Sequence, residues 1–329
     1  MVKRISYSDA LREGFVYLLN NYPEVFIIGQ GLWSPWYVGN TMKDLDKIYG
    51  KERIIDTPVS ESACTGAGVG ASLVGMKPIV IHPRMDFMLY AIDPIVNQAA
   101  KWSHMFGGQV SAGLTIRAII NRGGEQGAQH SQALHSWFSH IPGLRVVMPY
   151  TVQDARDLLI SSVISSDPVI FIDDRWLYDM EDEIDTYKNI ILSKEGPRYI
   201  SKGSDISIVA SGHTTRIAKE SRDELLKENI SCEVIDLRIL NPLNVDLIIE
   251  SINKTKNLLV LDGGWAACGI SAEIIAKVCE NIDLNILKSK PCRITLPDAP
   301  APTSFKLEKD YYLDKNKIIT HIHKQLSIK

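Results

Sequence analysis

The sequence has few cysteines and no closely spaced pair of them. In a chain of 329 residues there are five, an odd number, and no C-x-x-C motif occurs. They stand far apart at Cys64, Cys232, Cys268, Cys279 and Cys292. A chain of this length does not need disulfides to stabilise its core, and the pattern argues against a disulfide framework. We therefore expect free thiols and a protein of the reducing cytoplasm.

Long apolar runs are also missing. No stretch reaches the roughly 18 apolar residues that a membrane span needs, and residues 1–8 contain no apolar core of signal-peptide length. The formal net charge is only -3, so the sequence gives no reason to expect a nucleic acid or an anionic membrane as a partner. The hydrophobic fraction of 45% and the charged fraction of 23% are typical of a globular protein.

What the sequence does have is a regular alternation of short apolar runs with helical patterns, which is typical of parallel α/β layers. In the first half the predicted strands are 25–29, 78–81, 114–120, 145–148 and 168–172. The predicted helices are 6–20, 61–75, 91–105 and 151–164. Ser6 and Asp9 have the spacing of a capping box, which supports a helix start at that point.

The alternation stops at residues 178–198, which are rich in Asp, Glu, Lys and Tyr and lack helical periodicity. It resumes with predicted strands at 205–210, 231–236 and 257–261, and with helices at 217–229, 245–254, 271–280 and 315–326. We therefore predict an α/β protein with an N-terminal parallel-sheet domain at 1–177. An interdomain connection at 178–200 and a second α/β domain at 201–329 follow it.

The stretch 56–75, DTPVSESACTGAGVGASLVG, places an acidic residue at a helix start. A turn containing proline leads to Glu61, and the predicted helix after it consists of small residues that let another backbone approach closely. Glu61 could simply complement the helix dipole in the first turn. However, a carboxylate beside an apolar, glycine-rich helix is poorly solvated, and this setting suits a group that transfers protons.

The stretch 123–144, GGEQGAQHSQALHSWFSHIPGL, contains three histidines at intervals of five. On a helix this interval separates His130, His135 and His140 around the axis, and no Cys or Asp joins them at ligand spacing. The pattern therefore does not predict a metal cluster. For any one of these histidines, residue type alone favours a structural role.

Together these stretches resemble the β subunits of two-chain 2-oxo acid dehydrogenases of the pyruvate, branched-chain and acetoin type. The resemblance rests on DTPVSE followed by G-x-G-x-G, on DF-x-x-x-AID-x-I-x-N-x-AAK at 86–101, and on GGQ, QHSQ and HIPGLRVVMP. The second half adds VIDLRILNPLN at 234–244 and GGW-x-x-x-G-x-x-AEI at 263–274. These motifs lie in the order of the family along nearly the whole chain.

The resemblance implies a transketolase-like protein whose N-terminal domain binds the pyrimidine ring of thiamine diphosphate. In the family the cofactor lies between two chains, and the α chain holds the diphosphate through Mg²⁺ with a GDG-type motif that ends in asparagines. This sequence has no such motif, because LDGG at 261–264 does not fit it. The resemblance therefore implies a separate α subunit that binds Mg²⁺, in an assembly of two α and two β chains.

The resemblance also implies roles for single residues. Glu61 matches the catalytic glutamate that hydrogen-bonds the pyrimidine and relays a proton, and Phe87 matches the aromatic residue that packs on the ring. His130 matches a histidine near the substrate carboxylate and the acyl-transfer region. Tyr90 replaces a glutamine expected near the pyrimidine. IHP at 81–83 replaces the Glu-Phe-Met of many members and His135 replaces Ala or Glu, so the 2-oxo acid stays undetermined.

The family's potassium site is built from carbonyl oxygens and one aspartate side chain. Carried over to this sequence, it falls on Leu114, Ser162, Val163, Ser165 and Asp167. The position of the aspartate is occupied by Ser165, which puts the site in doubt.

Two other interpretations stay open. A split transketolase half, which moves two-carbon units between sugars, shares both domains and the glutamate, but its histidine loop usually reads like GPTHQ where this chain has GAQHSQ. A non-catalytic scaffold for an α chain is the other, and the presence of Glu61, Phe87 and His130 argues against it.

The resemblance finally implies a lipoyl acyltransferase as a further partner. In several family members the C-terminal region of the β subunit docks a basic binding domain through acidic groups. Here residues 321–329, HIHKQLSIK, carry lysines and no carboxylate side chain. Complementary charge governs partner choice at such surfaces, so we predict weak docking.

Overall fold

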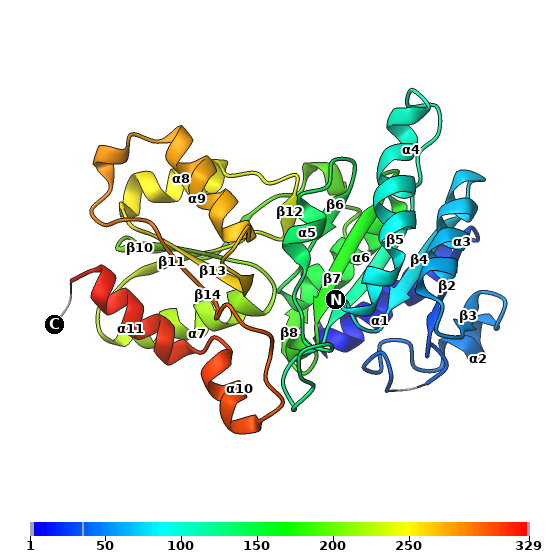
Figure 1. Cartoon of the computed structure of the whole chain (residues 1–329), viewed down its shortest axis with the longest axis horizontal. Helices are drawn as coiled ribbons and strands as arrows, with labels where there is room; N and C mark the ends of the chain where they lie inside the picture. The colour runs from blue at the N-terminus through cyan, green and yellow to red at the C-terminus, as the bar shows by residue number, and fades with distance from the viewer. Residues whose placement is uncertain (1–2, 35, 328–329) are drawn as a thin grey trace. The chain divides into compact units, whose positions relative to one another are not determined.

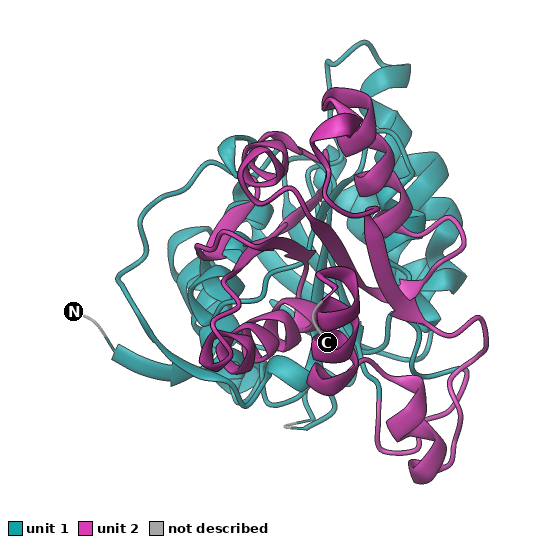
Figure 2. Cartoon of the chain, turned by 90° about the vertical axis from the view of Figure 1, so that its left-hand side faces the viewer, with its two compact units in different colours: residues 1–122, 129–195 teal, residues 123–128, 196–329 magenta. Residues whose placement is uncertain are grey.

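In the computed structural model, which describes residues 3–34 and 36–327, the chain forms two compact units. Unit 1 consists of residues 1–122 and 129–195, and unit 2 consists of residues 123–128 and 196–329 (Figure 2). The predicted α/β class with two domains is confirmed. The backbone passes from one unit to the other three times, because the short segment 123–128 belongs to unit 2.

Unit 1 is built on a parallel sheet with the order β6-β7-β5-β4-β2-β3. Its strands are β2 (Val25–Gln30), β3 (Ile54–Thr57), β4 (Lys77–His82), β5 (Thr115–Ile120), β6 (Arg145–Val147) and β7 (Val169–Asp174). All residues of β5 and β7 are buried, as expected for a parallel sheet covered on both faces. From β2 the chain continues to β3 on one side and later to β4 on the other, so the strand order reverses at β2.

The helices of unit 1 include those predicted at 6–20, 61–75 and 151–164, together with two short helices that were not predicted. In chain order the helices are α1 (Tyr7–Asn21), α2 (Leu45–Tyr49), α3 (Glu61–Leu73), α4 (Ala100–Met105), α5 (His135–Ser139) and α6 (Val152–Ile164) (Figure 1). The N-cap bond of the predicted capping box is present, because the Ser6 Oγ accepts a hydrogen bond of 3.1 Å from the Asp9 amide. Helix α1 packs on α6, where a Cβ at Gly14 would lie only 3.0 Å from Leu159.

Helix α3 packs tightly on β4 through one of its glycines. A Cβ at Gly68 would lie 2.6 Å from a methyl carbon of Val80, so any larger side chain would push the helix away from the strand. Gly66 and Gly70 lie on the exposed side of the helix, and a Cβ there would meet no atom within 4 Å. Helix α3, which begins at Glu61, is therefore held against β4.

The segment predicted as a helix at 91–105 is helical but not uniform. It consists of a 3₁₀ turn η1 (Phe87–Ala91), a π-helix η2 (Asp93–Ala99) and then α4. Pro94 near the start of η2 lacks a backbone N–H, and such a break in the hydrogen-bond ladder is a usual cause of non-α geometry.

Part of the predicted connection at 178–200 has regular structure. Strand β8 (Glu181–Ile184) pairs antiparallel with β1 (Lys3–Ser6), and the 3₁₀ turns η3 (Arg175–Leu177) and η4 (Leu192–Lys194) flank it. Tyr178 is buried in unit 1, where its hydroxyl donates to Asp173 at 2.5 Å. Asp173 also binds the buried Arg117 guanidinium through two hydrogen bonds of 2.9 and 2.8 Å.

Unit 2 has a smaller sheet with the order β14-β13-β10-β11-β9, in which only the edge strand β9 is antiparallel among the described strands. The strands are β9 (Arg198–Ser201), β10 (Ile206–Ala210), β11 (Cys232–Asp236), β13 (Leu258–Trp265) and β14 (Cys292–Leu296), with a further strand β12 (Ile239–Asn241). The helices are α7 (His213–Lys227), α8 (Asp246–Thr255), α9 (Ile270–Asn281), α10 (Phe305–Tyr311) and α11 (Lys315–Gln325), with a 3₁₀ turn η5 (Leu284–Ile286). No helix in the described part of the chain is long and apolar enough to cross a membrane.

The segment 123–128 is fixed within unit 2 by the region around α10. The Glu125 amide donates to a Glu308 carboxylate oxygen at 3.0 Å, and the Phe305 amide donates to the Glu125 carboxylate at 3.2 Å. Gly127 has a φ of +73°, and a Cβ there would lie 2.5 Å from Thr303. This position therefore requires glycine, and the residues just before Gln129 are held in one conformation.

Candidate functional site

A cavity of about 510 Å³ lies in unit 1 and is lined by residues that follow the carboxyl ends of strands. Its lining residues are Gln30, Tyr37, Val59, Glu61, Phe87 and Tyr90. Gln30 ends β2, Glu61 begins the helix after β3, and Phe87 and Tyr90 follow β4. In open α/β sheets ligands bind at this edge, where the strand order reverses. The fold thus brings together Glu61, Phe87 and Tyr90, which the sequence singled out.

Glu61 is half-buried at the first position of α3, where the helix dipole favours a negative charge. One turn further along, the Thr65 hydroxyl lies 3.1 Å from Nε2 of His82, and both residues are buried. Burial lowers the pKa of His82 to about 4. The imidazole is therefore neutral at pH 7 and adds no charge behind the Glu61 carboxyl.

The aromatic side of the cavity is formed by Phe87 and Tyr90, which lie on one 3₁₀ turn. The ring of His130 packs edge-on against Phe87, with 5.2 Å between the ring centroids. The Tyr90 side chain is 75% exposed. The predicted histidine is thus in contact with the wall of the cavity, and Tyr90 presents its ring to incoming molecules.

Asp86 connects the turn that carries Phe87 to the loop that carries His130. Its Oδ1 accepts hydrogen bonds from the backbone amide and the side-chain amide of Gln132, at 3.1 and 3.0 Å. Burial raises the pKa of the Asp86 carboxyl. Since Gln132 is two residues from His130, these bonds fix the loop beside the aromatic wall.

Three residues of the cavity were not predicted as site residues, namely Gln30, Tyr37 and Val59. The Gln30 side-chain amide donates to the Tyr37 hydroxyl at 3.0 Å, and the Arg175 guanidinium donates to the Tyr37 carbonyl. Gln30 directly follows the predicted strand 25–29, and its place at a carboxyl end was a usable signal. Tyr37 lies in an irregular loop, and no sequence pattern marks it.

The other histidines of the 123–144 stretch lie away from the cavity lining. His135 is buried at the start of α5, and His140 is exposed at its end. Among the described residues, no group of three or more His, Cys, Asp or Glu side chains could hold a metal ion.

The residues expected to bind potassium gather where α6 ends. Ser162 and Val163 belong to its last turn, and Ser165 is its C-cap. The Leu114 carbonyl accepts a hydrogen bond of 2.9 Å from the Val169 amide. The Asp167 carboxylate pairs with the Arg145 guanidinium at 2.9 Å.

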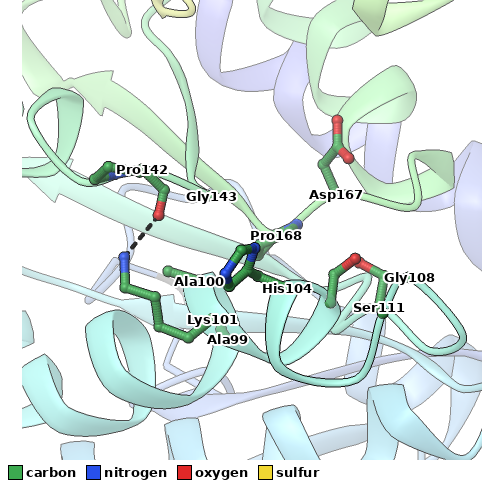
Figure 3. A pocket seen from close by; sticks show the side chains of 12 residues that line it. Ala99, Ala100, Lys101, His104, Gly108, Ser111, Pro142, Gly143, Asp167 and Pro168 are labelled. Atoms are coloured by element: carbon green, nitrogen blue, oxygen red, sulfur yellow. Dashed lines mark hydrogen bonds between the residues drawn. The ribbon is translucent and has the colours of Figure 1, made fainter.

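A second cavity, of about 720 Å³, lies beside α4 and the turn at 142–143 (Figure 3). Lys101 crosses part of it and donates to the Pro142 carbonyl at 2.8 Å. It is larger than the first cavity, but its lining residues come from α4 and from loops rather than from the reversal point of the sheet. The smaller cavity has the carboxylate, the amide and the aromatic rings, and we therefore take it as the candidate site.

Comparison with known proteins gives matches along nearly the whole chain. The family model "Transketolase, pyrimidine binding domain" matches residues 3–180, and "Transketolase, C-terminal domain" matches residues 197–318. The β subunit of acetoin:2,6-dichlorophenolindophenol oxidoreductase from Cupriavidus necator is 36% identical over 94% of this chain and 94% of its own. The β subunit of the mitochondrial pyruvate dehydrogenase E1 component from Bos taurus is 32% identical over 99% of this chain and 91% of its own.

Among solved structures, one titled as a split gene transketolase, inactive β4 tetramer, is similar over 99% of both chains. Its TM-score is 0.76 and its sequence identity is 18%. At this identity the likeness concerns the fold alone.

Proposed function

The chain belongs to the transketolase-type family, and from this premise we propose that it is the β subunit of a thiamine-diphosphate-dependent 2-oxo acid dehydrogenase. The observation that carries the proposal is the cavity that Glu61, Phe87 and Tyr90 line together at the reversal point of the sheet. The curated relatives add support, because they are β subunits of acetoin and pyruvate enzymes and match almost the whole chain.

The cavity suits the pyrimidine end of thiamine diphosphate. Phe87 and Tyr90 offer apolar ring surface for a flat heterocycle, and Gln30 and Glu61 offer hydrogen-bonding groups. When bound, thiamine diphosphate supplies the carbanion-stabilising chemistry that 2-oxo acid decarboxylation requires. In our proposal Glu61 hydrogen-bonds a ring nitrogen and exchanges a proton there, while Phe87 fixes the orientation of the ring.

His130 and its loop form the substrate side in this proposal. The histidine, held against Phe87 at 5.2 Å between centroids, can donate a hydrogen bond or a proton to a substrate oxygen. Asp86 acts through Gln132 and keeps the loop in place. It is therefore a positioning residue.

We further propose an α subunit that provides the magnesium and diphosphate half of the site, in an assembly of two α and two β chains. The relatives are named as β subunits, and this supports a second kind of chain. The proposal places the enzyme in the cytoplasm, in line with its five free cysteines. A lipoyl acyltransferase is the proposed acceptor enzyme.

The split-transketolase alternative has less support. The solved split-gene transketolase is 18% identical in sequence to this chain, whereas the acetoin and pyruvate β subunits are 31 to 36% identical to it. No contact within the described residues favours a purely scaffolding role over a catalytic one.

Reconstitution with an α subunit tests the proposal. The chain is copurified with a candidate α chain, and 2-oxo acids are screened with 2,6-dichlorophenolindophenol as electron acceptor, with and without thiamine diphosphate and Mg²⁺. We expect cofactor-dependent oxidation of one class of 2-oxo acid by the complex, and no activity and weak cofactor binding by this chain alone. Tight, magnesium-dependent binding by the isolated chain, measured by calorimetry, would contradict the division of roles. Ketol transfer between sugars would favour the transketolase alternative.

A further inference from the structure

Lys77, the first residue of β4, extends its side chain to the end of α6. Its Nζ donates hydrogen bonds to the backbone carbonyls of Val163, Ile164 and Ser165, at 3.3, 3.2 and 3.2 Å. The last carbonyls of a helix have no partner within the helix, and they form the negative end of its dipole. The lysine thus supplies a positive charge and hydrogen-bond donors where α6 lacks them.

The fit between the lysine and the helix end is specific. A protonated ammonium group has three N–H donors, and three carbonyl oxygens accept from it here. Lys77 is half-buried, and burial lowers the pKa of its ammonium.

The same helix end is where the family resemblance places a potassium ion, and the residues do not fit that ion. The Val163 carbonyl, one of the expected ligands, accepts from Lys77. Ser165 stands at the position of the aspartate, and its shorter side chain offers only a hydroxyl oxygen, which accepts from the Asp167 amide at 3.1 Å. The Leu114 carbonyl accepts from a backbone amide at 2.9 Å. Three of the expected groups, at Leu114, Val163 and Ser165, are therefore engaged by N–H donors of the chain itself.

We propose that the Lys77 ammonium takes the place of the potassium ion at the end of α6, so that the chain needs no monovalent metal ion there. An ammonium and a potassium ion carry the same charge, and backbone carbonyl oxygens can surround either. The lysine differs in being covalently attached, so its charge is present at any salt composition.

The test is thermal unfolding of the full-length chain in potassium, sodium and choline chloride at equal concentration. We expect the same Tm in all three salts for the unmodified chain. Lys77→Met keeps the length of the apolar stem but removes the charge, and it should lower Tm by at least about 4 °C, because it leaves three helix-end carbonyls without their donor. Lys77→Arg keeps the charge, so its Tm should stay close to that of the unmodified chain. This comparison can be made even if Lys77→Met does not fold.

Lys306→Met is the matched control. Lys306 is exposed on α10, and the same substitution there should leave Tm unchanged in every salt. A Tm of the unmodified chain that rises in potassium but not in choline would overturn the proposal, since it would show that an ion still binds. So would a Lys77→Met variant as stable as the unmodified chain. Neither result bears on the proposed catalytic function, which is measured separately.

Discussion

The ring of His130 stands edge-on to the ring of Phe87, with 5.2 Å between their centroids and 89° between their planes. Phe87 lines the candidate cofactor cavity, and His130 belongs to the loop that follows β5. The pair therefore connects the surface that would hold the cofactor with the loop that would meet the substrate. Substitutions of the two residues should affect different steps of the reaction.

For His130→Ala we expect turnover of the α/β enzyme to fall at least about 100-fold, the lower range for a positioned acid–base group, while the Kd for thiamine diphosphate stays nearly constant. Phe87→Ala should instead raise that Kd by about tenfold, through lost ring contact. Calorimetry and steady-state kinetics measure the two effects. His140→Ala, in the same stretch but exposed, is the control. Lost cofactor binding in His130→Ala, with normal turnover at saturation, would indicate a packing role for this histidine.

Glu61→Gln should preserve folding and assembly but lower kcat by a factor of at least about 100. The amide has nearly the shape of the carboxyl group, but it cannot take up and release the proton that the mechanism needs. Size-exclusion chromatography with the α subunit checks assembly, and the dye-reduction assay gives kcat. Glu280→Gln on the exposed end of α9 should change neither. If Glu61→Gln assembles and turns over normally, the proton-relay role is wrong.

The stability of the protein should depend on pH through the buried His82. Its pKa is lowered to about 4 in the folded protein, from 6.5 for an unperturbed histidine. Between these values the unfolded chain binds a proton on this residue and the folded chain does not. The free energy of unfolding should therefore decrease as pH falls from about 6.5 toward 4, by roughly 3 kcal/mol for this residue.

Denaturant unfolding at several pH values, compared between variants, measures this contribution. His82→Gln does not titrate and has an amide that can still bind Thr65, so its stability should vary less with pH over this range. His104→Gln, at an exposed site on α4, should behave like the unmodified chain. An unchanged pH slope in His82→Gln would assign the effect to other groups.

Docking of an acyltransferase should be weak at the C-terminal helix. Two of the predicted tail residues, Ile328 and Lys329, lie outside the described part of the chain. Within α11, His323 pairs with Glu228 at 2.7 Å, and Gln325 donates to the Leu258 carbonyl at 3.0 Å, so the helix is held in place. Lys324 adds positive charge, which repels a basic binding domain.

Surface plasmon resonance with such a domain, at two salt concentrations, measures the interaction. We expect weak binding by the unmodified complex and stronger, salt-sensitive binding by Lys324→Glu, because the new carboxylate attracts a basic partner. Tight binding by the unmodified complex that weakens in salt would show that carboxylates elsewhere on the protein form the docking surface.

The sequence predicted the buried parts of the fold well. Strands such as β2 and β5 are covered on both faces, so they appear as continuous apolar runs, and α1 carries its capping box. The elements that were missed are short or lie near the surface. Strand β14 is only partly buried and contains the exposed Arg293, and α10 is mostly charged and exposed. Such segments have no periodic pattern from which to predict them.

The candidate site was predicted where it consists of motifs and missed where it depends on tertiary contacts. Glu61, Phe87, Tyr90 and His130 stand in recognisable stretches, and their catalytic and binding roles stay predictions. Tyr37 enters the cavity only because its loop folds back beside Gln30. The contact of Lys77 with the end of α6 joins residues 86 to 88 positions apart, and nothing near Lys77 in the sequence indicates it.

The segment 123–128 restricts where the chain can be truncated. A polypeptide that ends at Glu195 would contain every residue of unit 1, yet its loop would lack Glu308 and Thr303, against which Glu125 and Gly127 are packed. Such a fragment could form its sheet and still leave the backbone that precedes His130 without support. An excised N-terminal domain is thus a poor substitute for the whole chain in ligand screening, and fusion tags belong at the termini rather than at the boundary at 195–196.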